Sequence, residues 1–517
     1  MRTPSFAPAR KDAFVAEKDQ LSSAPEPLDA ELSPPPALVG VRGRRLLWMI
    51  GALALFLRLA LLPFGHAWDT TVDYNVFIDL AKNHSPYDTF TNLTYIAQAA
   101  RWGTAYEYYA YPPVPLYIYY PLAKLYILLH PTANYYIALP NSFAMPNFTL
   151  DFFILFKAPI WLADFLLAAL LARISGTVRG FRDYLLNPYV LLISGAWTFD
   201  AIMVLGLVAG IYAVYKGKMF WAGLALAFGT MVKFFPAIIV PTVLFYLIKK
   251  KRPFKEIVLF LATYCLACLI FLGPFLQGVL TVLNFHGSRE GGGMTWEYLL
   301  RAVWLFPISV NLPPISDAVA AFGTPTLVIV MLLVYWYIWR TEMTLNRMVI
   351  VTLLGFFVGS KLVNEQYALM IFPFVWLEAY RLQGAWRWIY RLFWIIPLTF
   401  AIMNVPISHF FLTAYHMVFQ NQAVITVYGG FTGFDWTMFP WMHAADDQLI
   451  AFLLGLSFFG LSLTALFWPV RWPKRLQHAT KSTRISDTQL AVEKQINALE
   501  LSFTALEERN SYVTSSE

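Results

Sequence analysis

Three aspartates, Asp69, Asp73 and Asp79, follow directly on the first long apolar segment of the chain. Carboxylates just beyond the end of a membrane helix, near the lipid headgroups, can bind a divalent metal ion or accept the proton of an attacking hydroxyl group. Solvated carboxylates of an ordinary loop would give the same pattern. The spacing therefore predicts a candidate site of proton transfer or metal binding at this point, with the solvated loop as the alternative.

Two further segments carry side chains that are suited to phosphate. Residues 284–293 read Asn-Phe-His-Gly-Ser-Arg-Glu-Gly-Gly-Gly. The planar guanidinium of Arg289 can make paired hydrogen bonds to a phosphate, and the glycines let backbone amides approach an anion. Lys233 lies between two short apolar segments and precedes Phe-Phe-Pro. Its ammonium group could meet a lipid phosphate at the outer membrane edge, or it could simply extend to the membrane surface for solvation.

Three charges fall within or at the ends of apolar segments: Arg58, Asp164 and Asp200. A charge inside the bilayer is costly, so such residues usually pair with one another or line a cavity. The simplest interpretation of Arg58 and Asp164 is a structural ion pair between neighbouring helices. Asp200 could cap the N-terminus of a helix, where the helix dipole favours a negative charge, or it could face an outer cavity as a site residue.

These side chains belong to a chain of 517 residues, of which 58% are hydrophobic and only 13% charged. A soluble domain needs far more charge to cover its surface, so the apolar excess must face lipid. With about 20 residues per membrane helix, we predict an all-α, polytopic membrane protein of about 12 spans, with a range of roughly 10–13. The predicted spans are 46–64, 151–172, 184–197, 198–215, 219–232, 234–248, 256–276, 322–339, 348–360, 363–380, 391–412 and 448–469.

Basic residues mark one side of the membrane. If the spans simply alternate, every basic cluster falls on the same side, which the positive-inside rule assigns to the cytoplasm together with both termini. Because this distribution accounts for the net charge of +7, we expect no nucleic-acid partner. The clusters contain Arg42, Arg44 and Arg45; Arg173, Arg179 and Arg182; Lys216 and Lys218; Lys249–Arg252; Arg340 and Arg347; Arg381, Arg387 and Arg391; and Arg471, Lys474 and Arg475.

The same alternation places the long loops 66–112, 277–321 and 413–447 on the outer side. It also makes the apolar stretches 113–129 and 298–310 interfacial or re-entrant segments, since an extra span would put a basic cluster outside. Residues 1–41 are rich in Pro, Ala and charge and predict a disordered cytoplasmic tail. The membrane domain then covers 42–470. Residues 471–517 form a second cytoplasmic tail with a short coiled-coil or amphipathic helix.

In their order along the chain, these features resemble a known family. The chain is similar to the GPI mannosyltransferase I catalytic subunits, and more widely to the integral-membrane glycosyltransferases of the GT-C fold with their bacterial and archaeal members. The resemblance covers roughly residues 46–412. It rests on Arg58; Asp73 to Asp79 continuing to Ser85, Pro86 and Tyr87; Asp164; Asn187 with Pro188; Asp200; Lys233 with Pro236; His286 with Arg289; and Lys361 to Tyr367.

The resemblance implies inverting transfer of a hexose, with mannose favoured, from a polyprenyl-phosphate-linked donor to a lipid or glycan acceptor on the non-cytoplasmic face. Asp73 would be the catalytic base, since it matches the second Asp of the family's Asp-x-Asp motif. Thr71 replaces the first Asp, so no metal ion is favoured and a divalent metal would depend on Asp69 and Asp73. Arg289, His286 and Lys233 would bind the donor phosphate, and Asp200, Glu365, Gln366 and Asp69 the sugar or acceptor.

Two other functions remain open on the sequence alone. The chain could be a multi-pass transporter or lipid flippase, although no clear internal repeat is found and the candidate residues gather at one membrane face rather than at its middle. It could also be a non-catalytic membrane subunit of a larger complex. In each case the chain is an integral protein among membrane lipids, in the plasma membrane of a prokaryote or the endoplasmic reticulum of a eukaryote.

Overall fold

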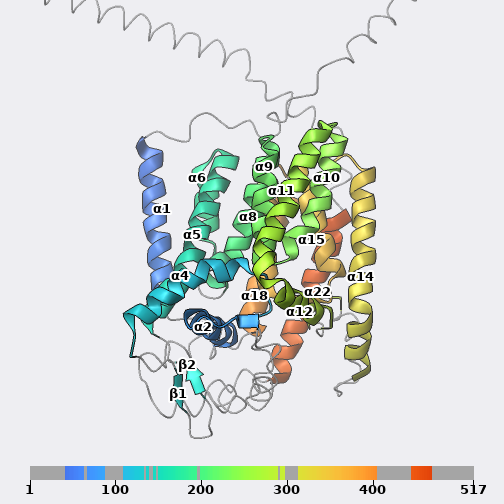
Figure 1. Cartoon of the computed structure of the whole chain (residues 1–517). Helices are drawn as coiled ribbons and strands as arrows, with labels where there is room; N and C mark the ends of the chain where they lie inside the picture. Colours follow the sequence, from blue (N-terminus) through green and yellow to red (C-terminus); the bar gives the residue numbers. More distant parts are fainter. Residues whose placement is uncertain are drawn as a thin grey trace, which may run out of the picture. The chain divides into compact units, whose positions relative to one another are not determined.

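The computed structural model describes residues 41–62, 67–87, 109–132, 136–138, 144–146, 149–194, 198–288, 292–296, 313–382, 384–404 and 444–467. The described chain is helical apart from two short strand pairs (Figure 1). The helices are α1 (Val41–Ala60), α2 (Ala67–Ala81), α4 (Val114–Leu129), α5 (Leu150–Ser175), α6 (Val178–Leu185), α7 (Pro188–Leu192), α8 (Asp200–Tyr215), α9 (Met219–Val232), α10 (Ile239–Lys249), α11 (Phe254–Leu272), α12 (Leu276–Ser288), α14 (Pro313–Arg340), α15 (Leu345–Gly359), α16 (Ala368–Ala379), α17 (Ala385–Arg391), α18 (Ile395–Asn404) and α22 (Ala444–Phe467). Three 3₁₀ turns, at Phe235–Ile238, Gly273–Phe275 and Glu365–Tyr367, adjoin α10, α12 and α16.

The fold is that of an α-helical membrane protein, as predicted. Within the described residues, Leu150–Ser175, Phe254–Leu283 and Ala321–Arg340 are long and apolar enough to cross a bilayer, and shorter apolar helices accompany them. In the second of these, only 11% of the most apolar window is buried inside the protein. Its large apolar side chains therefore face outward, where lipid rather than water is the stable neighbour. The total of about 12 spans stays a prediction.

Several predicted boundaries are wrong. The predicted span 184–197 is no single helix, because α6 ends at Leu185 and α7 begins at Pro188. Asn187 caps α7 by accepting hydrogen bonds from the amides of Tyr189 and Val190, with Pro188 in the first turn, where a missing amide hydrogen costs nothing. The predicted span 391–412 likewise divides between α17 and α18.

The outer segments also contain helices that were not predicted. The predicted loop 66–112 contains α2, and the predicted loop 277–321 contains α12 and the first turns of α14. The predicted interfacial stretch 113–129 contains α4, which runs across the long helices rather than alongside them (Figure 1). The stretches 298–310 and 413–443 and the predicted tails lie outside the described residues, except for Val41, with which α1 begins.

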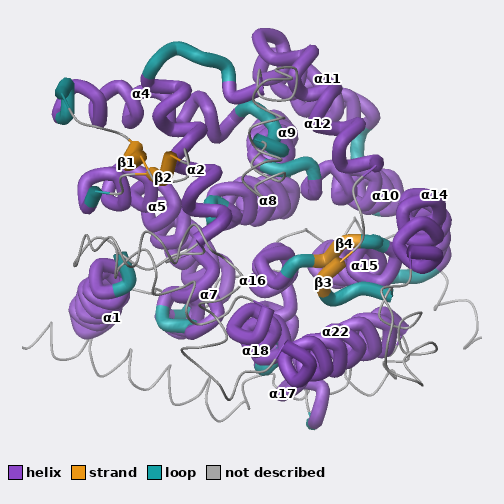
Figure 2. Tube along the Cα trace, turned by 90° about the horizontal axis from the view of Figure 1, so that it is seen from below, coloured by secondary structure: helices purple, strands orange, loops and turns teal. Residues whose placement is uncertain are grey.

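The described residues up to Leu463 belong to one compact unit, and the last turn of α22 is the only described part of a second unit, Thr464–Glu517. Within the first unit, α8 is central. It packs against α5, α9 and α16 (Figure 2), and almost all of its side chains are buried.

Glycine lets α8 and α9 approach closely. A Cβ atom on Gly206 of α8 would lie 2.8 Å from the amide nitrogen of Gly229 in α9, and one on Gly229 would lie 3.0 Å from the carbonyl oxygen of Met203. Small residues at such crossings are typical of membrane helices, where close backbone packing takes the place of the hydrophobic effect. The two helices form a hairpin, so Asp200 at the start of α8 comes next to Lys233 at the end of α9.

Contacts between helix ends show which helix ends lie on the same side of the protein. The amide of Asn346 at the start of α15 donates to the hydroxyl of Tyr215 at the end of α8, and the Asn346 side chain donates to Glu378 near the end of α16. Lys249 at the end of α10 donates to Ile338 O near the end of α14. We call this side, which carries Arg173, Arg182, Lys216, Lys249 and Arg340, the basic end. The opposite side, where α8 and α16 begin, is the site end.

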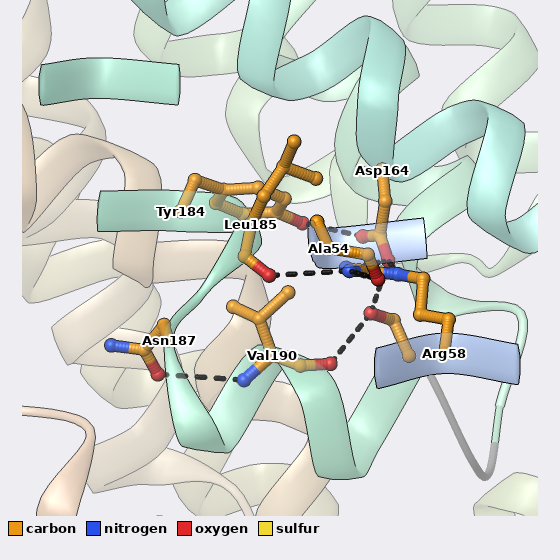
Figure 3. A network of polar contacts seen from close by, with 8 residues as sticks. Ala54, Arg58, Asp164, Tyr184, Leu185, Asn187 and Val190 are labelled. Carbon is orange, nitrogen blue, oxygen red and sulfur yellow. Dashed lines mark hydrogen bonds and ion pairs between the residues drawn. The ribbon is translucent and has the colours of Figure 1, made fainter. Parts of the chain in front are cut away.

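A buried polar network ties α1, α5, α6 and α7 together (Figure 3). The Arg58 guanidinium donates to Asp164 Oδ2 at 2.8 Å and to Leu185 O at 3.2 Å, and both charged side chains are fully buried. Tyr184 and Ser194 also donate to the carboxylate of Asp164. The predicted ion pair between Arg58 and Asp164 is therefore present, and the hydroxyl of Ser194 ties the residues just after α7 to it.

Candidate functional site

The centre of the site end is a buried ion pair between Asp200 and Lys233. Lys233 Nζ lies 2.7 Å from Asp200 Oδ2, with the two side chains 3% and 0% exposed. The hydroxyl of Thr198 donates to the same oxygen. Asp200 is the first residue of α8 rather than its cap, and the capping position is held by Phe199, which makes no side-chain capping bond. The carboxylate thus lies at the positive end of the helix dipole and also faces a cation.

Aromatic rings enclose the ammonium group of Lys233. Its nitrogen lies 4.9 Å from the ring centroid of Tyr111 and 5.3 Å from that of Phe199. These two rings contact each other edge to face, with centroids 4.9 Å apart. A cation held between ring faces is stabilised by their negative quadrupoles. The charge of Lys233 is therefore satisfied inside the protein, and its predicted contact with a donor phosphate stays a prediction.

Glu365 and Gln366 lie close to the same end of α8. They lie in the 3₁₀ turn that begins α16 and are 5% and 6% exposed. The hydroxyl of Tyr189 donates to Glu365 O at 2.6 Å. The ring of Tyr189 lies within electrostatic range of the carboxylates of both Asp200 and Glu365. Residues more than 160 positions apart in sequence are thus brought to one place.

His286 lies in the last turn of α12 and joins the same neighbourhood. Its Nε2 is 2.7 Å from Ala110 O, and its ring is 6.4 Å from that of Phe234, the residue after Lys233. The glycines that follow are paired with the segment before Glu365, because β3 (Gly292–Gly293) and β4 (Leu362–Val363) form a parallel pair. Arg289 itself lies outside the described residues.

Asp73 lies on α2, one layer of aromatic residues away from Lys233. Its side chain is 9% exposed. Burial raises the pKa of Tyr109, and the neighbouring groups Tyr87, Tyr111 and Asp73 raise it further. Tyr109 in turn contacts Tyr111, with ring centroids 5.7 Å apart. Asp73 is thus connected to the ion pair through two tyrosines.

The backbone of Asp69 belongs to α2, but its side chain lies outside the described residues, as does that of Thr71. Among the described residues, no three His, Cys, Asp or Glu side chains come close enough together to hold a metal ion. Asp69 and Asp73 as metal ligands therefore remain a prediction.

Two buried oxygen atoms at the site end accept no hydrogen bond from the described residues: Asp200 Oδ1 and Gln366 Oε1. A buried acceptor without a donor is costly, and hydroxyl or ammonium groups of a ligand are the donors that would satisfy it. The arrangement is therefore suited to binding a polyhydroxylated or amine-bearing group. The sequence did not single out Thr198, Phe199 or Tyr189, although the first two immediately precede Asp200.

One family model matches part of the chain. It is PIG-U, described as a GPI transamidase subunit, and it matches residues 181–315. This segment contains Asp200, Lys233 and His286 and covers less than half of the chain. No curated protein matches the chain.

The match corrects the function that the sequence predicted. A GPI transamidase subunit is not a hexosyltransferase, so the prediction of an enzyme that moves mannose from a polyprenyl-phosphate donor is wrong, and a non-catalytic membrane subunit agrees better with the match. The resemblance to mannosyltransferase I holds only at the coarser level of a multi-pass membrane protein similar to one of the GPI pathway.

Proposed function

We propose that this chain is a non-catalytic membrane subunit of a GPI transamidase-like complex, in which it holds the headgroup of the glycolipid that receives a protein. The match of residues 181–315 to the PIG-U model carries the proposal. In this view the partners are the other subunits of the complex and a GPI-type anchor precursor. The membrane is that of the endoplasmic reticulum, with the site end on its lumenal side.

The chemistry of the site end supports binding rather than catalysis. A general base must be free to take a proton from the reacting group. Asp200 is instead compensated by Lys233 at 2.7 Å and by the hydroxyl of Thr198. Such a carboxylate is a fixed acceptor, which suits the recognition of a hydroxyl or ammonium group.

The acceptors are spread over two elements that pack together. Oδ1 belongs to Asp200, the first residue of α8, and Oε1 belongs to Gln366, in the turn before α16. The two helices are in contact. A sugar ring offers several hydroxyl donors in fixed directions, and an ethanolamine ammonium offers three. We propose that Asp200 and Gln366 bind such groups, that His286 and Arg289 contribute to binding the lipid phosphate, and that Glu365 positions Tyr189.

The experiment follows the attachment of a GPI-anchored reporter protein in cells of the natural host. Cells that lack the chain should make the reporter but leave its carboxyl-terminal signal uncleaved and unanchored. The wild-type chain should restore anchoring, and Asp200→Ala, expressed at the same level, should not. Wild-type anchoring in cells that lack the chain would refute the proposal.

A further inference from the structure

A pocket opens toward the basic end, and neither Asp200 nor Lys233 lines it. It has a volume of about 620 Å³ and lies between α6, α16 and the segment from α17 to the start of α18. Helix α16 lines the pocket with Phe372 and Trp376, and Tyr380, which follows its last residue, lines it at the basic end. At 1.5 Å per residue, the pocket extends along α16 from Phe372, roughly 6 Å from the start of the helix, to Tyr380, roughly 18 Å from it. The volume is typical of small-molecule pockets.

Arginine and aromatic side chains line this pocket. The cations are Arg179, Arg182 and Arg391, and the rings include Trp376, Tyr380 and Trp388. The guanidinium of Arg391 lies 5.5 Å from the ring centroid of Tyr380 and 5.6 Å from that of Trp388. Stacking on two rings fixes the plane of the guanidinium and leaves its edge to donate hydrogen bonds.

The positive charge of the pocket is only partly compensated. Arg182 pairs with Asp183 at 2.6 Å, and the hydroxyl of Tyr380 also donates to that carboxylate. Within the described part of the chain, neither Arg179 nor Arg391 forms an ion pair with a carboxylate. Three arginines and one aspartate leave an excess of two positive charges in the lining. A phosphomonoester carries about −1.5 to −2 at neutral pH and matches that excess.

We propose that this pocket binds the headgroup of a lipid that carries a phosphomonoester. The arginines are suited to paired hydrogen bonds with phosphate oxygens, and the tryptophan and tyrosine rings provide an apolar wall for the glycerol or sugar part. Basic pockets between membrane helices near the surface are places where anionic lipid headgroups bind. The pocket goes beyond the proposed function, because its arginines lie at the basic end and none of the residues assigned to the glycolipid lines it.

Binding can be measured on the full chain in detergent by the shift in thermal unfolding temperature and by native mass spectrometry. The probes are dioctanoyl phosphatidic acid and dioctanoyl phosphatidylinositol 4-phosphate, which carry a phosphomonoester on a lipid, and inositol bisphosphate, which carries it in solution. Dioctanoyl phosphatidylglycerol has a phosphodiester only. We expect the two phosphomonoester lipids to bind at least about tenfold more tightly than phosphatidylglycerol. If inositol bisphosphate binds as tightly as the two phosphomonoester lipids, the pocket recognises the phosphomonoester and the ligand can be a soluble molecule.

Variants separate the pocket from general surface charge. Arg391→Ala and Arg179→Ala should each weaken phosphomonoester binding about tenfold, as expected for the loss of a charge-assisted hydrogen bond. Arg391→Lys, which keeps the charge but not the planar fork, should lose part of the affinity. Arg387→Ala is the matched control, because Arg387 is exposed on the same helix and does not line the pocket. Equal binding of phosphatidylglycerol, or equal losses in Arg387→Ala and Arg391→Ala, would overturn the proposal.

Discussion

At the scale of single residues, the pair of Asp200 and Lys233 determines how the site end is built. Both groups are removed from solvent, and a buried charge is tolerated only when it is paired and hydrogen-bonded. The pair thereby fixes the start of α8 against the end of α9. Its geometry leaves Asp200 Oδ1 without a donor among the described residues, which is the atom we assign to the ligand.

If Asp200 Oδ1 binds the ligand, variants of the ion pair should change protein stability and ligand binding separately. Lys233→Met should destabilise the protein by about 3–5 kcal/mol, since it leaves a buried carboxylate unpaired. The double variant Asp200→Leu with Lys233→Met should recover most of that stability, because an apolar pair of similar volume needs no charge compensation. Reporter anchoring should stay abolished in the double variant. Thermal unfolding in detergent measures the first effect, and full anchoring by the double variant would contradict the role of Asp200.

The residues of the site end could be found from sequence, but their partners could not. Charges at the ends of apolar segments are costly and so are informative in any membrane protein, which is why Asp200 and Lys233 were noticed. Their pairing was not predicted, although the predicted spans 198–215 and 219–232 are joined by a short turn, which brings the start of the first near the end of the second. The contacts of Tyr111, Tyr189 and Glu365 depend on packing between distant segments, which no local pattern shows.

At the scale of elements, the hairpin of α8 and α9 positions the ion pair through its glycines. Gly206 faces backbone atoms of α9, so an added methyl group would meet backbone and not a flexible side chain. The helices would have to separate, and the charged groups at their ends would move with them. Overpacking of this kind typically costs about 1–3 kcal/mol.

We therefore expect Gly206→Ala to lower the unfolding temperature and to reduce anchoring. Gly460→Ala is the matched control: Gly460 lies inside helix α22, and nothing outside its own helix lies within 4 Å of its added Cβ atom. That variant should unfold at or slightly above the wild-type temperature. Equal unfolding temperatures for the two variants would show that the α8–α9 contact is not close.

Elements that were predicted incorrectly share a physical cause. A search for long apolar segments finds helices that face lipid, but α2 is only 15 residues long and, where its side chains are described, buries Asp73 beside Tyr74, Phe77 and Ile78. Their helical spacing was visible in the sequence, although Asp, Thr and Asn interrupt its apolar character. The division of the predicted span 184–197 was also signalled, since Asn187 before Pro188 is a typical start of a helix.

At the scale of the whole molecule, the separation of charges between the two ends predicts the orientation in the membrane. The basic end should face the cytoplasm and the site end the opposite compartment. In a chain whose native Cys265 and Cys268 are replaced by Ala, a cysteine at exposed His84 should react with an impermeant reagent from the non-cytoplasmic side. A cysteine at exposed Lys216 should react only after permeabilisation. Reversed labelling would put the proposed glycolipid site in the cytoplasm.

The central claim is that the chain helps to transfer a protein to a complete glycolipid and does not itself build the glycolipid. Mass spectrometry of the glycolipids that accumulate in cells lacking the chain tests this claim most directly, with cells that carry Asp200→Ala beside them. We predict that the accumulating anchor precursor is complete, with every hexose in place, in both cell lines. A precursor that lacks a hexose, restored by the wild-type chain, would contradict the account.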